Sequence, residues 1–184
     1  MTVFRGFIAI DIDASPKLIA FEKDISKTGA DVKLVKPENI HITIKFLGNT
    51  NDNHIDVIEQ AMRASVQNIT PFSITLNGTG VFPNQKYIKV IWVGIINTTA
   101  IETIAKTIDT SLIPLGFPKE QRGFSAHLTV GRVKTARNKD QLLKIIEQYN
   151  NKEFSVQEIR SIFLKKSELT PQGPLYSTLR EVRL

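Results

Sequence analysis

The sequence predicts an α+β fold in which two similar lobes surround a central cleft. The chain has 184 residues, a length that suits one domain. Apolar residues alternate in some segments and recur at helical spacing in others, which predicts strands interleaved with helices. A His-x-Thr strand, a helix and a strand that begins with Phe-Ser follow in the same order in both halves. This order is typical of a duplicated unit, although segments of alternating strand and helix can also resemble each other without duplication.

The first strand and the first helix carry clear local signals. Residues 3–11 are apolar on both faces, as a central strand would be. Ser15 is suited to cap the following helix, with Pro16 at its first position. The helix has one apolar stripe and a glycine stop: Leu18, Phe21, Ile25 and Gly29.

The remaining elements follow from the same two periodicities. Strands are expected over residues 41–48, 71–82, 86–96, 126–134, 153–165 and 176–184. Helices are expected where apolar residues recur every three or four positions, over residues 52–67, 101–112 and 142–149. Neither a linker nor a low-complexity segment interrupts this order, so we expect a single domain over residues 1–184.

Composition narrows the class of protein. The formal net charge is +6, and a cationic surface favours partners that carry phosphate. The sequence has no cysteine, which fits a cytoplasmic protein and argues against a structural zinc site. The longest apolar run is far shorter than the roughly 18–20 residues that span a bilayer, so no membrane partner is expected.

Two matched tetrapeptides carry the functional signal: His41-Ile-Thr and, 86 residues later, His127-Leu-Thr. Side chains at positions i and i+2 of a strand point to the same face. Each histidine therefore projects with its threonine, Thr43 or Thr129, while the apolar residues between them face a core. If a two-fold axis relates the lobes, the two pairs converge on the cleft.

Two imidazoles beside two hydroxyls can open a phosphodiester without a metal ion. Imidazole is the side chain best matched to proton transfer near neutral pH, so one ring can accept a proton while the other donates one. Threonine hydroxyls can donate hydrogen bonds to the phosphate oxygens. The alternative for either histidine alone is an ordinary, satisfied strand residue, but the repetition of the whole motif favours a shared site.

The third histidine, His54, lies in a polar segment before a helix and lacks the motif, so we expect a solvated or capping residue. A zinc site formed by His41, His127 and His54 would need a carboxylate or a further histidine where the motifs place threonine. No metal and no cofactor are therefore expected.

With these motifs in place, the chain resembles a known family: the RNA 2′,3′-cyclic phosphodiesterases, also called 2′-5′ RNA ligases, of the two-histidine (2H) phosphoesterase superfamily. The resemblance runs the length of the chain. It is carried by the segments FRGFIAID, KPENIHITIKFLG, GTGVFPN, FSAHLTVGRV and SELTPQGPLY.

The resemblance implies a single bilobal domain of two pseudo-symmetric antiparallel-sheet lobes with outer helices. It implies metal-independent hydrolysis of RNA 2′,3′-cyclic phosphate ends to 2′-phosphomonoesters, with reversible 2′-5′ ligation of tRNA halves as an additional activity. His41 would be the proton donor and His127 the proton acceptor, although the symmetry of the site leaves the two roles open. Thr43 and Thr129 would contact the phosphate. RNA ends or nucleoside 2′,3′-cyclic phosphates would be the partners of a monomer.

Arg132 also matches a family position and is expected to bind substrate through its charge. Strict strand alternation would turn it away from the His127 face, and the alternative is a surface arginine. Three aromatic residues could stack on a base or belong to the core: Phe4, Trp92 and Tyr176.

Two further hypotheses remain at this stage. A non-catalytic module that binds RNA ends would use the same positive charge without turnover. An enzyme acting on another cyclic phosphate, or on a 2′-5′ linkage, would keep the histidines and change the substrate.

Overall fold

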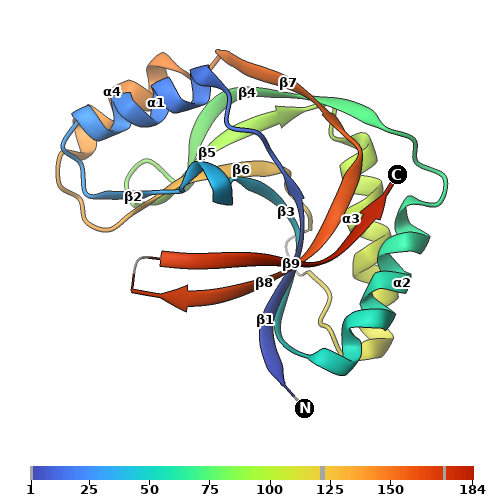
Figure 1. Cartoon of the computed structure of the whole chain (residues 1–184). Coiled ribbons are helices and arrows are strands. Elements are labelled where there is room, and N and C mark those ends of the chain that lie inside the picture. Colours follow the sequence, from blue (N-terminus) through green and yellow to red (C-terminus); the bar gives the residue numbers. More distant parts are fainter. Residues whose placement is uncertain (1, 121–122, 172) are drawn as a thin grey trace.

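One curled antiparallel sheet runs through the part of the chain that the structure describes, residues 2–120, 123–171 and 173–184 (Figure 1). In this computed structural model the strand order is β7-β4-β5-β6-β3-β1-β8-β9, and β2 pairs with β6. The strands are β1 Val3–Asp11, β2 Val32–Leu34, β3 His41–Asn51, β4 Phe72–Pro83, β5 Ile88–Ile96, β6 His127–Val133, β7 Glu153–Ile159, β8 Ser161–Thr170 and β9 Gly173–Arg183.

The helices lie in two pairs on the outside of the sheet (Figure 1). Helices α1 (Pro16–Lys27) and α4 (Lys139–Gln148) pack together over one half, and α2 (Ile55–Val66) and α3 (Thr99–Leu112) pack together over the other. Three short 3-10 helices complete the order: η1 Pro37–Asn39, η2 Asp52–His54 and η3 Ile113–Leu115. The α+β class and the two lobes are therefore confirmed, with the lobes joined as halves of one sheet.

Local signals in the sequence account for most of these boundaries. The hydroxyl of Ser15 accepts a hydrogen bond from the backbone N–H of Leu18 at 3.2 Å, which caps α1 as expected. The stripe of Leu18, Phe21 and Ile25 is fully buried. Because the stripe packs against the sheet, the outer face of α1 stays polar and exposed.

The two histidine strands meet at the middle of the sheet, where the halves join. Strand β3 pairs with β1 on one side and with β6 on the other, and β6 pairs with β3 and β5. The repeated order noticed in the sequence corresponds to β3–α2–β4 in one case and β6–α4–β7 in the other. The pseudo-symmetry therefore places the two His-x-Thr motifs on neighbouring strands.

The C-terminal region differs from the expectation of two closing strands. Only Arg160 separates β7 from β8, and the chain crosses there from one half of the sheet to the other. Strand β8 then pairs along its whole length with β9, so three strands are present. The sequence had no glycine or proline at residue 160 to mark the break.

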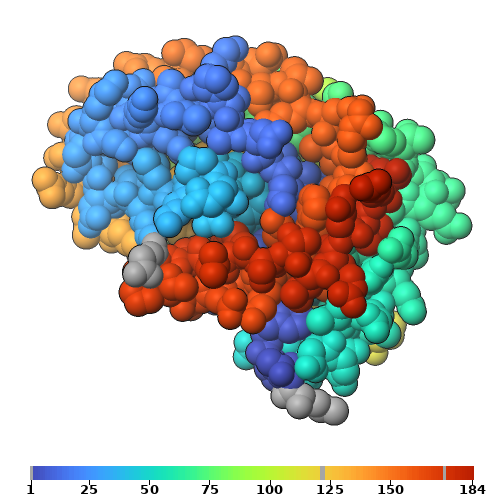
Figure 2. Space-filling view, viewed as in Figure 1, coloured from blue at the N-terminus to red at the C-terminus, as the bar shows by residue number. Residues whose placement is uncertain are grey.

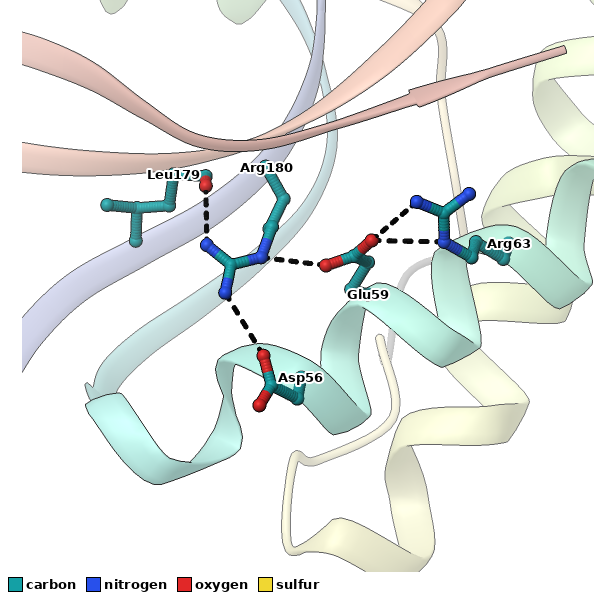
Figure 3. Close-up of polar contacts among 5 residues, drawn as sticks. All are labelled: Asp56, Glu59, Arg63, Leu179 and Arg180. Atoms are coloured by element: carbon teal, nitrogen blue, oxygen red, sulfur yellow. Dashed lines mark hydrogen bonds and ion pairs between the residues drawn. The ribbon is translucent and has the colours of Figure 1, made fainter.

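An arginine on the edge strand β9 fastens this hairpin to α2 (Figure 3). Arg180 donates from Nε to Glu59 at 2.7 Å and from a terminal nitrogen to Asp56 at 3.1 Å. Arg63 binds the other oxygen of the Glu59 carboxylate. The base of the β8–β9 hairpin is therefore held on the helix, while its tip extends toward β2 (Figure 1).

Among the described residues, no helix combines the length and the apolar character needed to cross a bilayer.

Candidate active site

The two His-x-Thr motifs face the same side of the sheet because β3 and β6 pair between them. Ile42 is registered with Leu128, and both side chains are fully buried toward the helices. The other face carries the four half-buried polar residues: His41, Thr43, His127 and Thr129. Antiparallel register sets each histidine opposite the threonine of the other motif. The two histidines are then diagonal neighbours, with backbone positions about 7–8 Å apart.

Each imidazole is fixed by the same backbone contact. Nδ1 of His41 lies 2.7 Å from the carbonyl oxygen of Asn39, and Nδ1 of His127 lies 2.8 Å from that of Ser125. A carbonyl oxygen can only accept, so Nδ1 of each ring carries the hydrogen. Nε2 of each ring is left to accept or release a proton.

Different aromatic side chains contact the two imidazole rings. The ring centroid of His41 lies 5.0 Å from that of Phe7 and 5.3 Å from that of Tyr176. His127 meets Phe82 edge-on at 5.2 Å. Phe7 comes from β1 and Tyr176 from the β8–β9 hairpin, so two elements hold His41 in addition to its own strand.

A β-bulge changes which side chains of β6 face the histidines. Trp92 is registered with Thr129 but the preceding Ile91 with Gly131, which leaves Val130 as an extra residue. Val130 and Gly131 are both buried. A bulge of this kind reverses the alternation of the residues that follow it.

The bulge returns Arg132 to the His127 face, contrary to the expectation from strict alternation. A Cβ atom on Gly131 would lie 2.8 Å from the side chain of Val32 on the core side, so the next residue points the other way. Arg132 is exposed, and its charge contributes to lowering the pKa of His41. The arginine therefore lies near both motifs.

Strand β3 repeats this bulge at the same distance from its histidine. Ile44 and Lys45 are both buried, and the register with β1 shifts there. Phe46 follows on the histidine face with 63% of its surface exposed. The counterpart of Arg132 in the other half is thus an exposed phenylalanine.

The surroundings of His41 favour its neutral form. Burial of the ring lowers its pKa below the usual value, and the cations of Lys165 and Arg132 act in the same direction. The Asn39 carbonyl and the Asp11 carboxylate oppose this shift without reversing it. At neutral pH, His41 in the free protein is therefore mainly uncharged.

We expect an NMR titration of the His41 ring protons to show half-protonation below pH 6.5 in the free protein. Because the unfolded chain binds this proton more readily, the stabilisation from His41 is complete above pH 6.5 and is lost as the pH falls through the folded-state pKa. A midpoint at or above 6.5 would contradict the burial described here.

The structure also separates the remaining candidates. Phe4 is a core residue, 7% exposed, whereas Trp92 packs over Gly80 and is registered with Thr129, so Trp92 lies on the histidine face. His54 occupies the N-cap position of α2 without a side-chain cap bond and packs against Phe117 at 5.8 Å. Tyr176 alone of the three aromatic candidates touches a motif histidine.

Among the described residues, no group of three or more His, Cys, Asp or Glu side chains could hold a metal ion. His54 is not part of any such arrangement with His41 and His127.

Sequence reasoning missed the residues that support the site from a distance. The side chain of Asn39 donates to the carbonyl of Pro174 at 3.1 Å, which ties the backbone that holds His41 to the β8–β9 hairpin. Tyr176 lies on the same hairpin. The segment SELTPQGPLY marks this region in the sequence, but Gln172 within it lies outside the described residues. Only the tertiary contacts reveal that the hairpin reaches His41.

Comparison with known proteins shows the family to which the chain belongs. The family model described as LigT like phosphoesterase matches residues 9–92 and 96–176. The RNA 2′,3′-cyclic phosphodiesterase of Methanothermobacter thermautotrophicus is 36% identical over 182 residues, 98% of each chain. That of Methanocaldococcus jannaschii is 42% identical over 179 residues, 96% of this chain and 99% of its own.

Solved structures give the same fold. E. coli LigT complexed with 3′-AMP is similar with a TM-score of 0.71 at 19% identity, and the match covers 100% of this chain and 99% of LigT. The chain belongs to the LigT-like phosphoesterase family and is an enzyme that acts on phosphoesters.

Proposed function

We propose that this enzyme hydrolyses the 2′,3′-cyclic phosphate at an RNA end to a 2′-phosphomonoester, with two histidines as the acid and the base. The observation that carries the proposal is the pair of imidazoles on neighbouring strands, each fixed through Nδ1 so that Nε2 is free for proton transfer. The relatives named as RNA 2′,3′-cyclic phosphodiesterases support this choice of substrate.

In the proposed reaction, Nε2 of His127 removes a proton from a water molecule as its oxygen bonds to phosphorus. The bond between phosphorus and the 3′ oxygen breaks, and Nε2 of His41 donates its proton to that oxygen. The products are a 2′-phosphomonoester and a 3′-hydroxyl group. A positioned acid and base each contribute typically about 10²–10⁴-fold to such a step.

The threonines would bind the phosphoryl group, and Arg132 would contribute charge that attracts the substrate. The hydroxyls of Thr43 and Thr129 lie on the histidine face, where they can donate to the non-bridging oxygens. The positive charge of Arg132, further along β6 on the same face, would attract the negatively charged substrate.

The low pKa of His41 is compatible with its role as the acid. A bound phosphodiester carries a negative charge between the two rings, and a nearby negative charge favours the imidazolium form. Once protonated, a histidine with a low intrinsic pKa transfers its proton readily to the departing oxygen.

Phosphorus NMR of the product tests the proposal. Incubation with a nucleoside 2′,3′-cyclic phosphate in a buffer that contains a chelator should give the 2′-monophosphate. A 3′-monophosphate would mean that the other ester bond breaks. Binding without any monoester would instead support the non-catalytic module.

Ligation would use the same groups, with a 5′-hydroxyl of a second RNA in place of water. The product would then contain a 2′-5′ phosphodiester. We also propose, from the lack of cysteine, that the enzyme works in the cytoplasm.

A further inference from the structure

A second cation lies beside Arg132 on the histidine face. In the pairing of β2 with β6, Lys33 is registered directly opposite Arg132. Directly opposite residues in an antiparallel pair point to the same face, with Cβ atoms about 4.5–5.5 Å apart. The flanking residues Val32 and Leu34 pack against the core, so Lys33 must point to the other side.

The β8–β9 hairpin approaches the same place. The Nζ atom of Lys33 would lie 3.3 Å from a Cβ atom on Gly173, at the tip of the hairpin. Figure 2 shows this tip, in orange-red, directly below the light-blue segment that carries β2. Because Pro174 also accepts a hydrogen bond from Asn39, the tip lies between Lys33 and the backbone that holds His41.

Neither cation is neutralised within the described residues. The ion pairs found there use other lysines and arginines, and no carboxylate lies within 4.0 Å of the Lys33 or Arg132 side chain. Two adjacent, unpaired cations repel each other, so their placement favours a bound anion between them.

The distance from the motifs suits a second phosphate on the same strand of RNA. Thr129 and Arg132 pair with β5 residues two positions apart, Trp92 and Val90. Two strand positions correspond to about 7 Å along β6. This spacing is comparable to the step between successive phosphates in an extended single strand.

We propose that Lys33 and Arg132 form a subsite for the phosphodiester that precedes the cyclic phosphate, so that the enzyme favours an RNA strand end over a free nucleotide. The inference rests on the proposed function, because the cyclic phosphate must lie between His41 and His127. Lys33 lies on β2, opposite Arg132, and not on either strand that carries a His-x-Thr motif. Its removal should affect only the longer substrate.

The test compares Lys33→Gln with the wild-type enzyme on two substrates: a nucleoside 2′,3′-cyclic phosphate and a short oligoribonucleotide that ends in the same group. We expect kcat/KM for the oligonucleotide to fall roughly tenfold, the scale of one charge-assisted contact, and kcat/KM for the nucleotide to stay unchanged. The slope of log(kcat/KM) against log salt concentration for the oligonucleotide should be shallower by the contribution of about one phosphate contact.

Two controls isolate the contact. Lys23→Gln removes an exposed lysine from α1 and should change kcat/KM for neither substrate. An oligonucleotide with a neutral methylphosphonate at its last linkage should behave like the free nucleotide with both enzymes.

The outcomes separate the two proposals. If neither substrate is turned over, the proposed function fails. If the nucleotide is turned over but kcat/KM for the oligonucleotide is no higher, the subsite is refuted while the activity stands. The same holds if Lys33→Gln lowers kcat/KM for both substrates by the same factor.

Discussion

Replacing His127 or His41 with alanine should lower kcat on a nucleoside 2′,3′-cyclic phosphate by roughly 10²–10⁴-fold, the usual contribution of a positioned base or acid. Each ring is held by a backbone carbonyl two residues earlier in the chain and lies on a paired central strand. The substitution therefore removes the proton carrier from a scaffold that the rest of the sheet maintains. Initial rates in the presence of a chelator would measure the loss.

The third histidine provides the matched control. His54→Ala removes an imidazole that packs against Phe117, outside the motifs, and should leave kcat within about twofold of the wild-type value. Full activity of either His41→Ala or His127→Ala would contradict the acid–base pair.

Lys45→Met should lower the free energy of unfolding by about 3 kcal/mol, since it breaks a buried ion pair from one side. The Lys45 side chain is 3% exposed, and its ammonium donates to Asp109 at 2.5 Å and to the carbonyl of Pro118 at 2.9 Å. The Asp109 carboxylate also accepts the backbone N–H of Glu120 at 3.1 Å. Without the lysine, a largely buried carboxylate would lack its cation. Denaturant unfolding would measure the change.

A double variant and a surface ion pair test whether the unpaired buried carboxylate causes this loss of stability. Replacing both partners, Lys45→Met with Asp109→Leu, should recover much of the loss because no charge is then left unpaired. Lys27→Met breaks a lysine–aspartate pair of similar length at the surface, where Lys27 is 75% exposed, and should have little effect. If Lys45→Met lowers the free energy of unfolding no more than Lys27→Met does, Lys45 is not the buried anchor described here.

The sequence contained enough information to predict that each motif histidine shares a strand face with its threonine, because this arrangement depends on a short-range rule. A period of two puts His41 with Thr43, and His127 with Thr129, whatever surrounds the strands. The duplicated order of segments then indicated that the two strands occupy equivalent places. That β3 and β6 pair directly is seen only in the structure.

The bulges could not be predicted from the same pattern. Whether Arg132 faces the histidines depends on one extra residue in β6, which exists only in relation to the register of β5. Strict alternation would likewise put Lys45 on the face of His41, but the bulge in β3 turns it toward Asp109. Register is a tertiary property, so local alternation gave the wrong face for both.

The burial of Glu22, on helix α1, could likewise not be predicted from the local pattern. This residue lies next to the apolar stripe of α1 and is 8% exposed, and burial raises the pKa of its carboxyl to about 7. A charged residue beside such a stripe normally remains at the solvent edge. Its burial depends on how closely α1 packs on its neighbours, which the sequence does not encode locally.

The most direct test of the account is whether both imidazoles bind the same phosphate. A nucleoside 2′-monophosphate, the proposed product, would be titrated into protein labelled with nitrogen-15 in its histidines. We predict that the Nε2 signals of His41 and His127 shift together, with one dissociation constant, while those of His54 do not move. A shift of only one of the two, or two different constants, would contradict a shared phosphate site.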